Sequence, residues 1–275
     1  MISKTNQISN GVKPLIVANW KCNPATMAEA KELFDKIVEG VAALEKGEPL
    51  HDGTGREVVI CPPFVYLATL GASAFAKSFG GLRIGSQDCF WQEKGAYTGE
   101  VSPKMLKDLG CQYVILGHSE RRRNFGETDE MINKKIKAAL SARLTPILCL
   151  SSAERGATAK EEMAIQLRGA MVGIEKSDIQ NIVFTYEPVW AISTTEACVV
   201  ATPENTAEGK IFIREVISEL FGKDTAESAR IIYGGSVDSK NISGFIKDAK
   251  MDGALVGAAS LKPEEFVNAV KNATA

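Results

Sequence analysis

The chain has 275 residues, of which 45% are hydrophobic and 24% are charged, and its formal net charge is −2. This balance excludes the strongly basic surface of proteins that bind nucleic acids or anionic membranes. No apolar run is long enough to span a bilayer, so neither a nucleic acid nor a membrane is expected as a partner.

The N-terminus and the cysteines indicate the compartment. Residues 1–13 lack the apolar core of a signal peptide and are expected to form a flexible extension. The six cysteines are scattered singly, without a CxxC pair. In a chain without a secretion signal this usage indicates reduced thiols, so we expect a cytoplasmic protein. With only His51 and His118 present, a histidine-based metal site is not expected.

Strand-like and helix-like segments alternate along the whole chain. Short apolar runs rich in β-branched residues predict strands at 15–20, 57–61, 82–87, 112–117, 146–150, 181–186, 230–233 and 253–256. Apolar spacing, with proline at several starts, predicts helices at 25–44, 64–79, from 103, and at 129–142, 159–174, 203–221, 238–249 and 263–270. The glycine-rich stretch 47–55 is expected to be an exposed loop.

About eight strand–helix units predict an α/β fold, the closed (β/α)8 barrel of parallel strands ringed by helices, as a single domain over 1–275. The alternative, a doubly wound open sheet, usually has fewer strands and opens with a glycine-rich dinucleotide turn. No such turn follows the first strand, where Asn19-Trp20-Lys21 stands instead. The barrel is therefore favoured.

A carboxylate follows the sixth predicted strand. Glu187 and Pro188 come directly after the apolar run 181–186, and because proline lacks a backbone N–H we expect the strand to end there. In parallel α/β folds this end of the strands handles ligands. Glu187 is therefore a candidate base, followed by a possible lid at 190–195. The equally weighted alternative is a structural carboxylate that caps the next helix.

Other strand ends supply complementary groups. Lys21, beside Asn19, would place a positive charge against a phosphate-bearing substrate and a developing oxyanion, although most lysines are merely solvated. His118 would polarise a carbonyl as a neutral imidazole, or would be a buried histidine that bonds only to backbone. We expect Arg121 and Arg122 to form structural ion pairs.

The last two predicted strands end in small residues that suit an anion. Gly234, Gly235 and Ser236 follow the seventh strand, and Gly257 and Ala258 follow the eighth. In this fold the corresponding turns commonly bind phosphate through backbone N–H groups. Either turn taken alone is as readily explained as a tight turn, but both together favour a phosphate site.

Six motifs in order resemble the triosephosphate isomerase family along nearly the whole chain. They are Ala18–Lys21, Gly95–Ser102, Ile115–Arg122, Tyr186–Ile192, Tyr233–Val237 and Leu255–Gly257. The resemblance implies a TIM barrel that interconverts dihydroxyacetone phosphate and glyceraldehyde 3-phosphate without cofactor or metal. The roles of a glutamate base, a neutral histidine and a closing loop come from the family and are not worked out from this sequence.

Carried onto this sequence, the family roles assign proton transfer to Glu187, enediolate binding to His118 and Asn19, and charge neutralisation to Lys21. The phosphate would be held by Ser193, Ser236, Gly257 and Ala258, and Glu120, Gly234 and Gly235 would play supporting parts. The resemblance also implies a homodimer, in which Thr98 reaches the partner's site.

Several positions depart from the family pattern. The lid tip reads Ile192–Thr195 (Ile-Ser-Thr-Thr) instead of Ile-Gly-Thr-Gly, and the segment after it is longer. Serine and threonine adopt the positive φ angles of such a tip only at a cost, so we expect an altered lid. Ser151-Ser152 replaces a usual Gly-Glu, which removes a supporting contact. Asp88 replaces an asparagine, which would make its loop sensitive to pH.

The resemblance leaves alternatives open, because a fold does not guarantee an activity. The main alternative is a catalytically weak or inactive barrel that binds a phosphate ligand. A different phosphosugar enzyme is a weaker option, because the ends of strands two, three and five offer little acid–base chemistry beyond Asp88.

Overall fold

The computed structural model describes residues 13–46, 55–71, 82–192 and 199–273. The N-terminal extension to residue 12, the loop 47–54 and the lid tip 193–198, with Ser193 and Cys198, lie outside the described residues. None of the described helices is long and apolar enough to cross a bilayer.

Eight parallel strands close into one barrel in sequence order, and β1 pairs with β8. They are β1 (Leu15–Asn19), β2 (Glu57–Cys61), β3 (Leu82–Ser86), β4 (Tyr113–Leu116), β5 (Thr145–Ser152), β6 (Val183–Pro188), β7 (Arg230–Tyr233) and β8 (Gly253–Val256). The predicted closed barrel is confirmed, and the open sheet is excluded.

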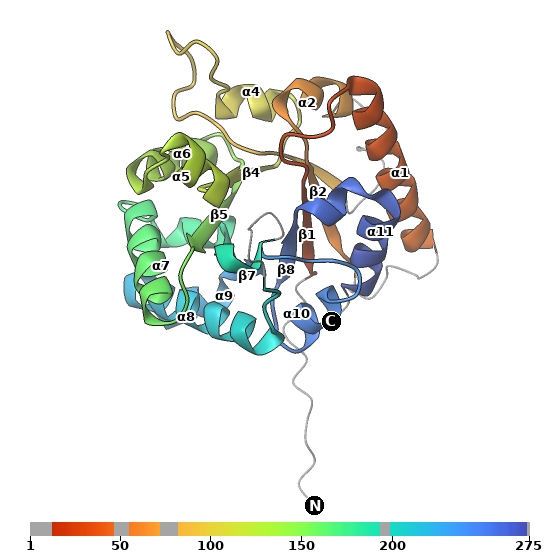
Figure 1. The fold of residues 1–275 in the computed structure, drawn as a ribbon. Helices are drawn as coiled ribbons and strands as arrows, with labels where there is room; N and C mark the ends of the chain where they lie inside the picture. Colours follow the sequence, from red (N-terminus) through yellow and green to blue (C-terminus); the bar gives the residue numbers. More distant parts are fainter. Residues whose placement is uncertain (1–12, 47–54, 72–81, 193–198, 274–275) are drawn as a thin grey trace, which may run out of the picture.

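Helices ring this barrel on the outside (Figure 1). They are α1 (Met27–Lys46), α2 (Phe64–Gly71), α4 (Pro103–Asp108), α5 (Ser119–Phe125), α6 (Asp129–Ser141), α7 (Ala157–Ala170), α8 (Pro203–Phe221), α9 (Lys223–Ser228), α10 (Ile242–Lys247) and α11 (Pro263–Asn272), with 3₁₀ turns at Lys176–Asn181, Val189–Ala191 and Ala258–Leu261. The segment between β3 and α4 projects from the body of the barrel.

The core has two layers because successive strand side chains point to opposite faces. In β1, Leu15 and Val17 belong to the cluster that fills the barrel, whereas Ile16 and Ala18 belong to the larger cluster shared with the helices. At the amino-terminal ends of the strands, Glu57 accepts a hydrogen bond from Tyr113 Oη at 2.7 Å and pairs with Arg230 at 2.9 Å. These polar contacts lie opposite the carboxyl ends, where we expect the site.

The predicted end of the sixth strand is wrong. Glu187 and Pro188 belong to β6 and pair in register with Ser151 and Ser152 of β5. On the other side, pairing with β7 stops at Tyr186. The missing N–H of Pro188 is tolerated because it lies at the last residue of the strand, beyond the β7 ladder.

Helix boundaries also differ from the predictions. The last helix before β8 is shorter than expected, Ile242–Lys247, because Asp238 and Asn241 form a local turn in which the Asn241 side chain accepts from Asp238 N–H at 2.9 Å. The helix predicted over 64–79 is described only to Gly71. The short helices α5 and α9 were not predicted, since neither has an apolar repeat long enough to signal one.

Candidate active site

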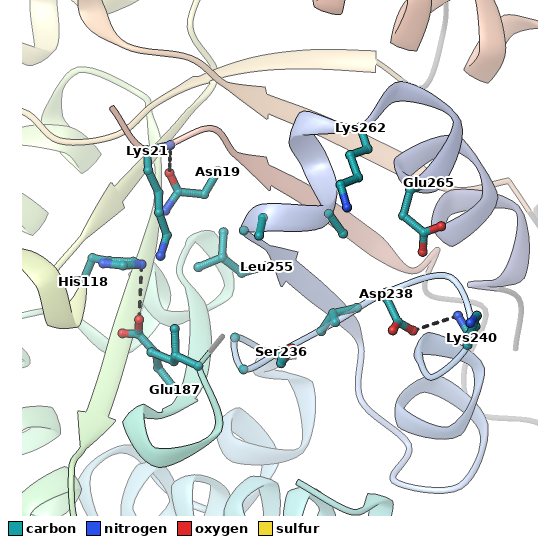
Figure 2. A pocket seen from close by; sticks show the side chains of 17 residues that line it. Asn19, Lys21, His118, Glu187, Ser236, Asp238, Lys240, Leu255, Lys262 and Glu265 are labelled. Atoms are coloured by element: carbon teal, nitrogen blue, oxygen red, sulfur yellow. Dashed lines mark hydrogen bonds and ion pairs between the residues drawn. The ribbon is translucent and has the colours of Figure 1, made fainter. Parts of the chain in front are cut away.

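A cavity of about 350 Å³ opens at the carboxyl ends of the strands. Of the residues predicted for the site, it is lined by Asn19, Lys21, His118, Glu187, Gly234, Gly235, Ser236, Gly257 and Ala258. Lys21, His118 and Glu187 converge on one side of the cavity, and Ser236 lies across from them (Figure 2). The strand ends therefore bring one carboxylate, one imidazole and one ammonium to a single space.

Glu187 is fully buried and is held by donors from the start of α5. Its Oε2 accepts from Ser119 N–H at 3.1 Å, and its Oε1 accepts from the Ser119 hydroxyl at 2.8 Å. Oε1 also lies 3.2 Å from His118 Nε2. Because these groups are neutral donors, the carboxylate is oriented without an ammonium or guanidinium in direct contact. Ser119 was not predicted as a partner of Glu187; its position directly after His118 was the available signal.

The tautomer of His118 follows from its role as the N-cap of α5. Nδ1 accepts the backbone N–H of Glu120 at 3.3 Å, so this nitrogen carries no proton. The ring proton therefore lies on Nε2, which faces Glu187 in Figure 2. This neutral imidazole is a hydrogen-bond donor that can bind a carbonyl oxygen in the cavity.

Lys21 has a left-handed backbone, with φ of 54°. A non-glycine residue holds this conformation only where its surroundings fix it. Here the Asn19 side chain accepts from Lys21 N–H at 3.0 Å, and the Gln87 amide donates to the Lys21 carbonyl at 2.8 Å. Glu120 Oε1 lies 2.5 Å from the Lys21 ammonium. These contacts fix both ends of Lys21, and Gln87 is a partner that the sequence analysis did not anticipate.

The turn after β7 is bonded to β6 and to the segment that follows it. Gly234 N–H donates to Tyr186 O at 2.8 Å, and Ser236 N–H donates to Ala191 O at 2.7 Å. A Cβ on Gly235 would lie 2.0 Å from the Tyr233 hydroxyl oxygen. This glycine is therefore required by packing within the turn, whatever binds there. Ser236 lines the cavity, whereas its backbone N–H already donates to Ala191 O.

The turn after β8 begins the 3₁₀ turn Ala258–Leu261. Ser260 closes this turn by donating to Gly257 O through both its N–H, at 2.8 Å, and its hydroxyl, at 2.7 Å. A Cβ on Gly257 would lie 3.5 Å from Lys21 Cε, so the lysine side chain runs close to this turn. The arrangement suits an anion placed between the Lys21 ammonium and the backbone of the turn.

The start of the expected lid is anchored by contacts that the sequence did not signal. The Arg155 guanidinium lies 4.1 Å from the centre of the Trp190 ring. Val199 N–H donates to Trp190 O at 3.1 Å and joins the two ends of the lid segment. At the end of β5, where the family usually has Gly-Glu, the Ser152 hydroxyl donates to Glu162 at 2.5 Å.

The remaining candidates lie outside the cavity lining. Arg121 pairs with Asp88 at 3.0 Å and Arg122 with Asp129 at 2.6 Å, as expected for structural ion pairs. Thr98 is exposed on the projecting segment, and Ser193 falls outside the described residues. Among the described residues, no group of three or more His, Cys, Asp or Glu side chains could hold a metal ion.

Comparison with known proteins assigns the family. The triosephosphate isomerase family model matches residues 14–273. Triosephosphate isomerase of Caldanaerobacter subterraneus is 46% identical over 94% of this chain and 98% of its own length. Those of Dictyoglomus thermophilum and Citrifermentans bemidjiense are 45% and 44% identical, over 94% of this chain and 99% and 98% of their own lengths. The chain therefore belongs to the triosephosphate isomerase family of enzymes.

Proposed function

We propose that this chain interconverts dihydroxyacetone phosphate and glyceraldehyde 3-phosphate by proton transfer through an enediolate. The observation that carries the proposal is the buried Glu187 carboxylate, held by Ser119 and His118 at the wall of a cavity that also contains Lys21. A barrel that only bound a phosphate would have no use for a base in this position. The relatives, which are named triosephosphate isomerases, agree with this chemistry.

In the proposed reaction Glu187 removes a proton from the carbon that bears the hydroxyl group. The electron pair of that C–H bond forms the carbon–carbon double bond, and the carbonyl oxygen takes up negative charge. His118 Nε2–H and the Asn19 amide donate hydrogen bonds to the oxygens, and Lys21 offsets the charge. After a proton moves between the two oxygens, Glu187 returns its proton to the neighbouring carbon.

For this step Glu187 must exchange contacts. Its two oxygens accept from Ser119 at 3.1 and 2.8 Å, and a substrate carbon has to take the place of one of these donors. Neutral donors suit this exchange, because a hydrogen bond in a folded protein contributes only about 1 kcal/mol net. We therefore propose that Ser119 holds the Glu187 carboxylate in place when no substrate is bound.

The phosphate is proposed to lie between the turns after β7 and β8. Gly257 and Ala258 would offer backbone N–H groups, and Ser236 its hydroxyl. Alanine at 258 in place of a usual glycine is a mild change, because the donor is backbone. The Ser236 N–H becomes available only if Ala191 moves away, which would couple phosphate binding to movement of the lid segment.

The lid is proposed to be atypical, with serine and threonine where the family has glycines. A lid excludes water and protects the enediolate from losing its phosphate. We therefore expect reduced turnover, or more elimination to methylglyoxal, than a lid with Gly at 193 and 195. A phosphate-release assay of the parent and of Ser193→Gly/Thr195→Gly measures this, and equal elimination by both would contradict the altered lid.

Assembly as a homodimer in the cytoplasm is also proposed, with Thr98 reaching the partner's site near Lys21. The projecting segment that carries Thr98 has an aromatic cluster, in which Phe90 lies 4.1 Å from Trp91 and 4.8 Å from Tyr97 between ring centres. Tyr97 is 45% exposed, so this surface has apolar area left to bury. Sedimentation of the parent and of Tyr97→Asp tests it, and a monomeric parent would contradict it.

The test of the activity itself is steady-state isomerisation of glyceraldehyde 3-phosphate by the parent and by Glu187→Asp. Activity that depends on Glu187 supports the proposal. Absence of turnover together with retained binding of a phosphate analogue would instead support the phosphate-binding barrel.

A further inference from the structure

A buried cluster of charges lies at the root of the projecting segment. Lys135 Nζ on α6 lies 2.8 and 2.9 Å from the two oxygens of Asp88 and also contacts Glu127 Oε1. Arg121 on α5 lies 3.0 Å from Asp88 and 3.4 Å from Glu127. Asp88, Glu127 and Lys135 are all buried. Two carboxylates thus share one buried ammonium, with one guanidinium at the side.

In this cluster the two negative and two positive charges balance, but not every buried polar atom forms a hydrogen bond. Glu127 Oε2 is buried and has no hydrogen-bond partner among the described residues. Burial, with the neighbouring Glu127 carboxylate, raises the pKa of Asp88 to about 6, although Lys135 and Arg121 act to lower it. Lys135 from α6, Arg121 from α5 and Glu127 from the turn between them are the charged groups that face Asp88. Loss of its charge would leave the buried cluster with an excess positive charge.

The same elements hold the groups of the cavity. Gln87, the residue before Asp88, donates its amide to the carbonyls of Lys21 and Cys61, at 2.8 and 2.9 Å. The first turn of α5 carries Ser119, which binds Glu187, and Glu120, which binds Lys21. Arg121 follows directly and is the residue that Asp88 binds. Asp88 is therefore adjacent to Gln87, which contacts Lys21, and binds Arg121, which is adjacent to Glu120. Both neighbours contact the site directly.

We propose that Asp88 is a proton-linked positioning residue for the isomerase site. Its ionised carboxylate ties the root of the projecting segment to α5 through Arg121 and to α6 through Lys135. Protonation releases Arg121 and Lys135 from a carboxyl that stays buried, and this shifts Gln87 and the first turn of α5, and with them Lys21 and the donors to Glu187. The inference rests on the proposed isomerase activity and goes beyond it, since it makes turnover depend on a group that touches no substrate.

The test compares kcat of the parent with kcat of Asp88→Asn between about pH 5 and pH 8, a range that contains the raised pKa of Asp88, about 6. Asparagine keeps the size of the side chain but cannot ionise. The ratio of the two kcat values cancels every other titration that the two enzymes share, including that of the substrate phosphate. We expect the parent to be about tenfold faster at the high end, as for lost hydrogen bonds to charged groups, with the ratio falling to one near the low end.

Asp129→Asn is the matched control, because Asp129 also binds an arginine of α5, Arg122, at 2.6 Å. Its kcat ratio to the parent is expected to be the same at every pH. Glu127→Gln is the second variant: loss of its charge should move the midpoint of the Asp88 effect to lower pH. A flat ratio for Asp88→Asn, or an unmoved midpoint in Glu127→Gln, would overturn the proposal.

Failure of the inference and failure of the proposed function are distinguishable. A parent without isomerase activity at the high end of the range refutes the function. The link between Asp88 and α5 can then be measured without substrate, by amide hydrogen exchange of α5 in the parent and in Asp88→Asn. Protection of α5 that falls on acidification only in the parent supports the tie, and identical profiles refute it.

Discussion

Two buried carboxylates in this molecule have opposite surroundings. Glu187 at the mouth accepts hydrogen bonds from Ser119 and lies against His118, all neutral groups. Asp88 at the root of the projecting segment contacts the cations Lys135 and Arg121. A carboxylate that must take up and return a proton needs donors that it can leave, whereas one that joins elements needs partners that hold it. The difference indicates which of the two is placed for chemistry and which for architecture.

Removal of the base should have the largest effect. Glu187→Gln is expected to lower kcat by roughly 10³-fold or more, since general base catalysis contributes up to about 10⁴-fold. The amide keeps one acceptor oxygen but turns an NH2 group toward one of the donors that the carboxylate accepts from, so the free energy of unfolding should fall by about 1–3 kcal/mol. Steady-state kinetics and denaturant unfolding of the same preparation check both parts. A kcat within tenfold of the parent would remove Glu187 from the chemical step and break the comparison.

The second carboxylate should show its effect in stability, with a definite sign. Because the pKa of Asp88 is raised from 3.8 to about 6 in the folded chain, the unfolded chain releases this proton first. The contribution of Asp88 is therefore complete below the unfolded pKa and is lost as the pH rises through about 6. Relative to Asp88→Asn, the parent should lose about 1.4 kcal/mol of unfolding free energy between about pH 5 and pH 7.5.

Denaturant unfolding of both chains at the two pH values measures this loss. A parent that instead gains stability over Asp88→Asn on going to the higher pH would show that Lys135 and Arg121 outweigh the burial of the carboxylate. Together with a kcat that is higher for the parent at that pH, the expected result would mean that Asp88 is kept for positioning at a cost in stability.

The smallest expected effect concerns the Ser119 hydroxyl, which donates to Glu187. Ser119→Ala removes the hydroxyl that lies 2.8 Å from Glu187 and leaves the backbone N–H in place. We expect a change of about fivefold in kcat, the size of one net hydrogen bond of about 1 kcal/mol. Ser102→Ala, which removes the hydroxyl that caps α4, is the control for loss of a serine hydroxyl away from the mouth. An effect of Ser119→Ala no larger than that of the control would mean that the N–H alone orients Glu187.

Much of this architecture is predictable because the information is local. Six of the eight strands, for example Glu57–Cys61 and Arg230–Tyr233, lie within the apolar runs that predicted them, because a buried parallel strand needs such a run on both faces. The strand ends then indicate Asn19, Lys21, His118 and Glu187 without further input. The ring of helices follows from the same alternation.

What could not be predicted depends on contacts between distant residues. Helix α5 has the sequence SERRRNF, without an apolar repeat, and is held by the His118 cap and by ion pairs to Asp88 and Asp129. Without α5, the position of Ser119 directly after His118 was the one signal that it contacts Glu187. Lys135 and Asp88 are 47 residues apart and meet only once the barrel forms. The hydrogen bond from Ser236 N–H to Ala191 O likewise depends on how distant segments pack, so it could not be predicted.

The pairing of β1 with β8 has a consequence for synthesis of the chain. Leu15 to Ala18 find their partners at Gly253 to Val256, close to the other end of the sequence. On the ribosome, the nascent protein therefore exposes two unpaired strand edges, on β1 and on whichever strand was made last, until β8 emerges. Lys21 and the turn at Gly257 meet only at that moment. A prematurely terminated chain lacking β8 would thus be inactive and prone to edge-to-edge association, which makes it a natural client for chaperones.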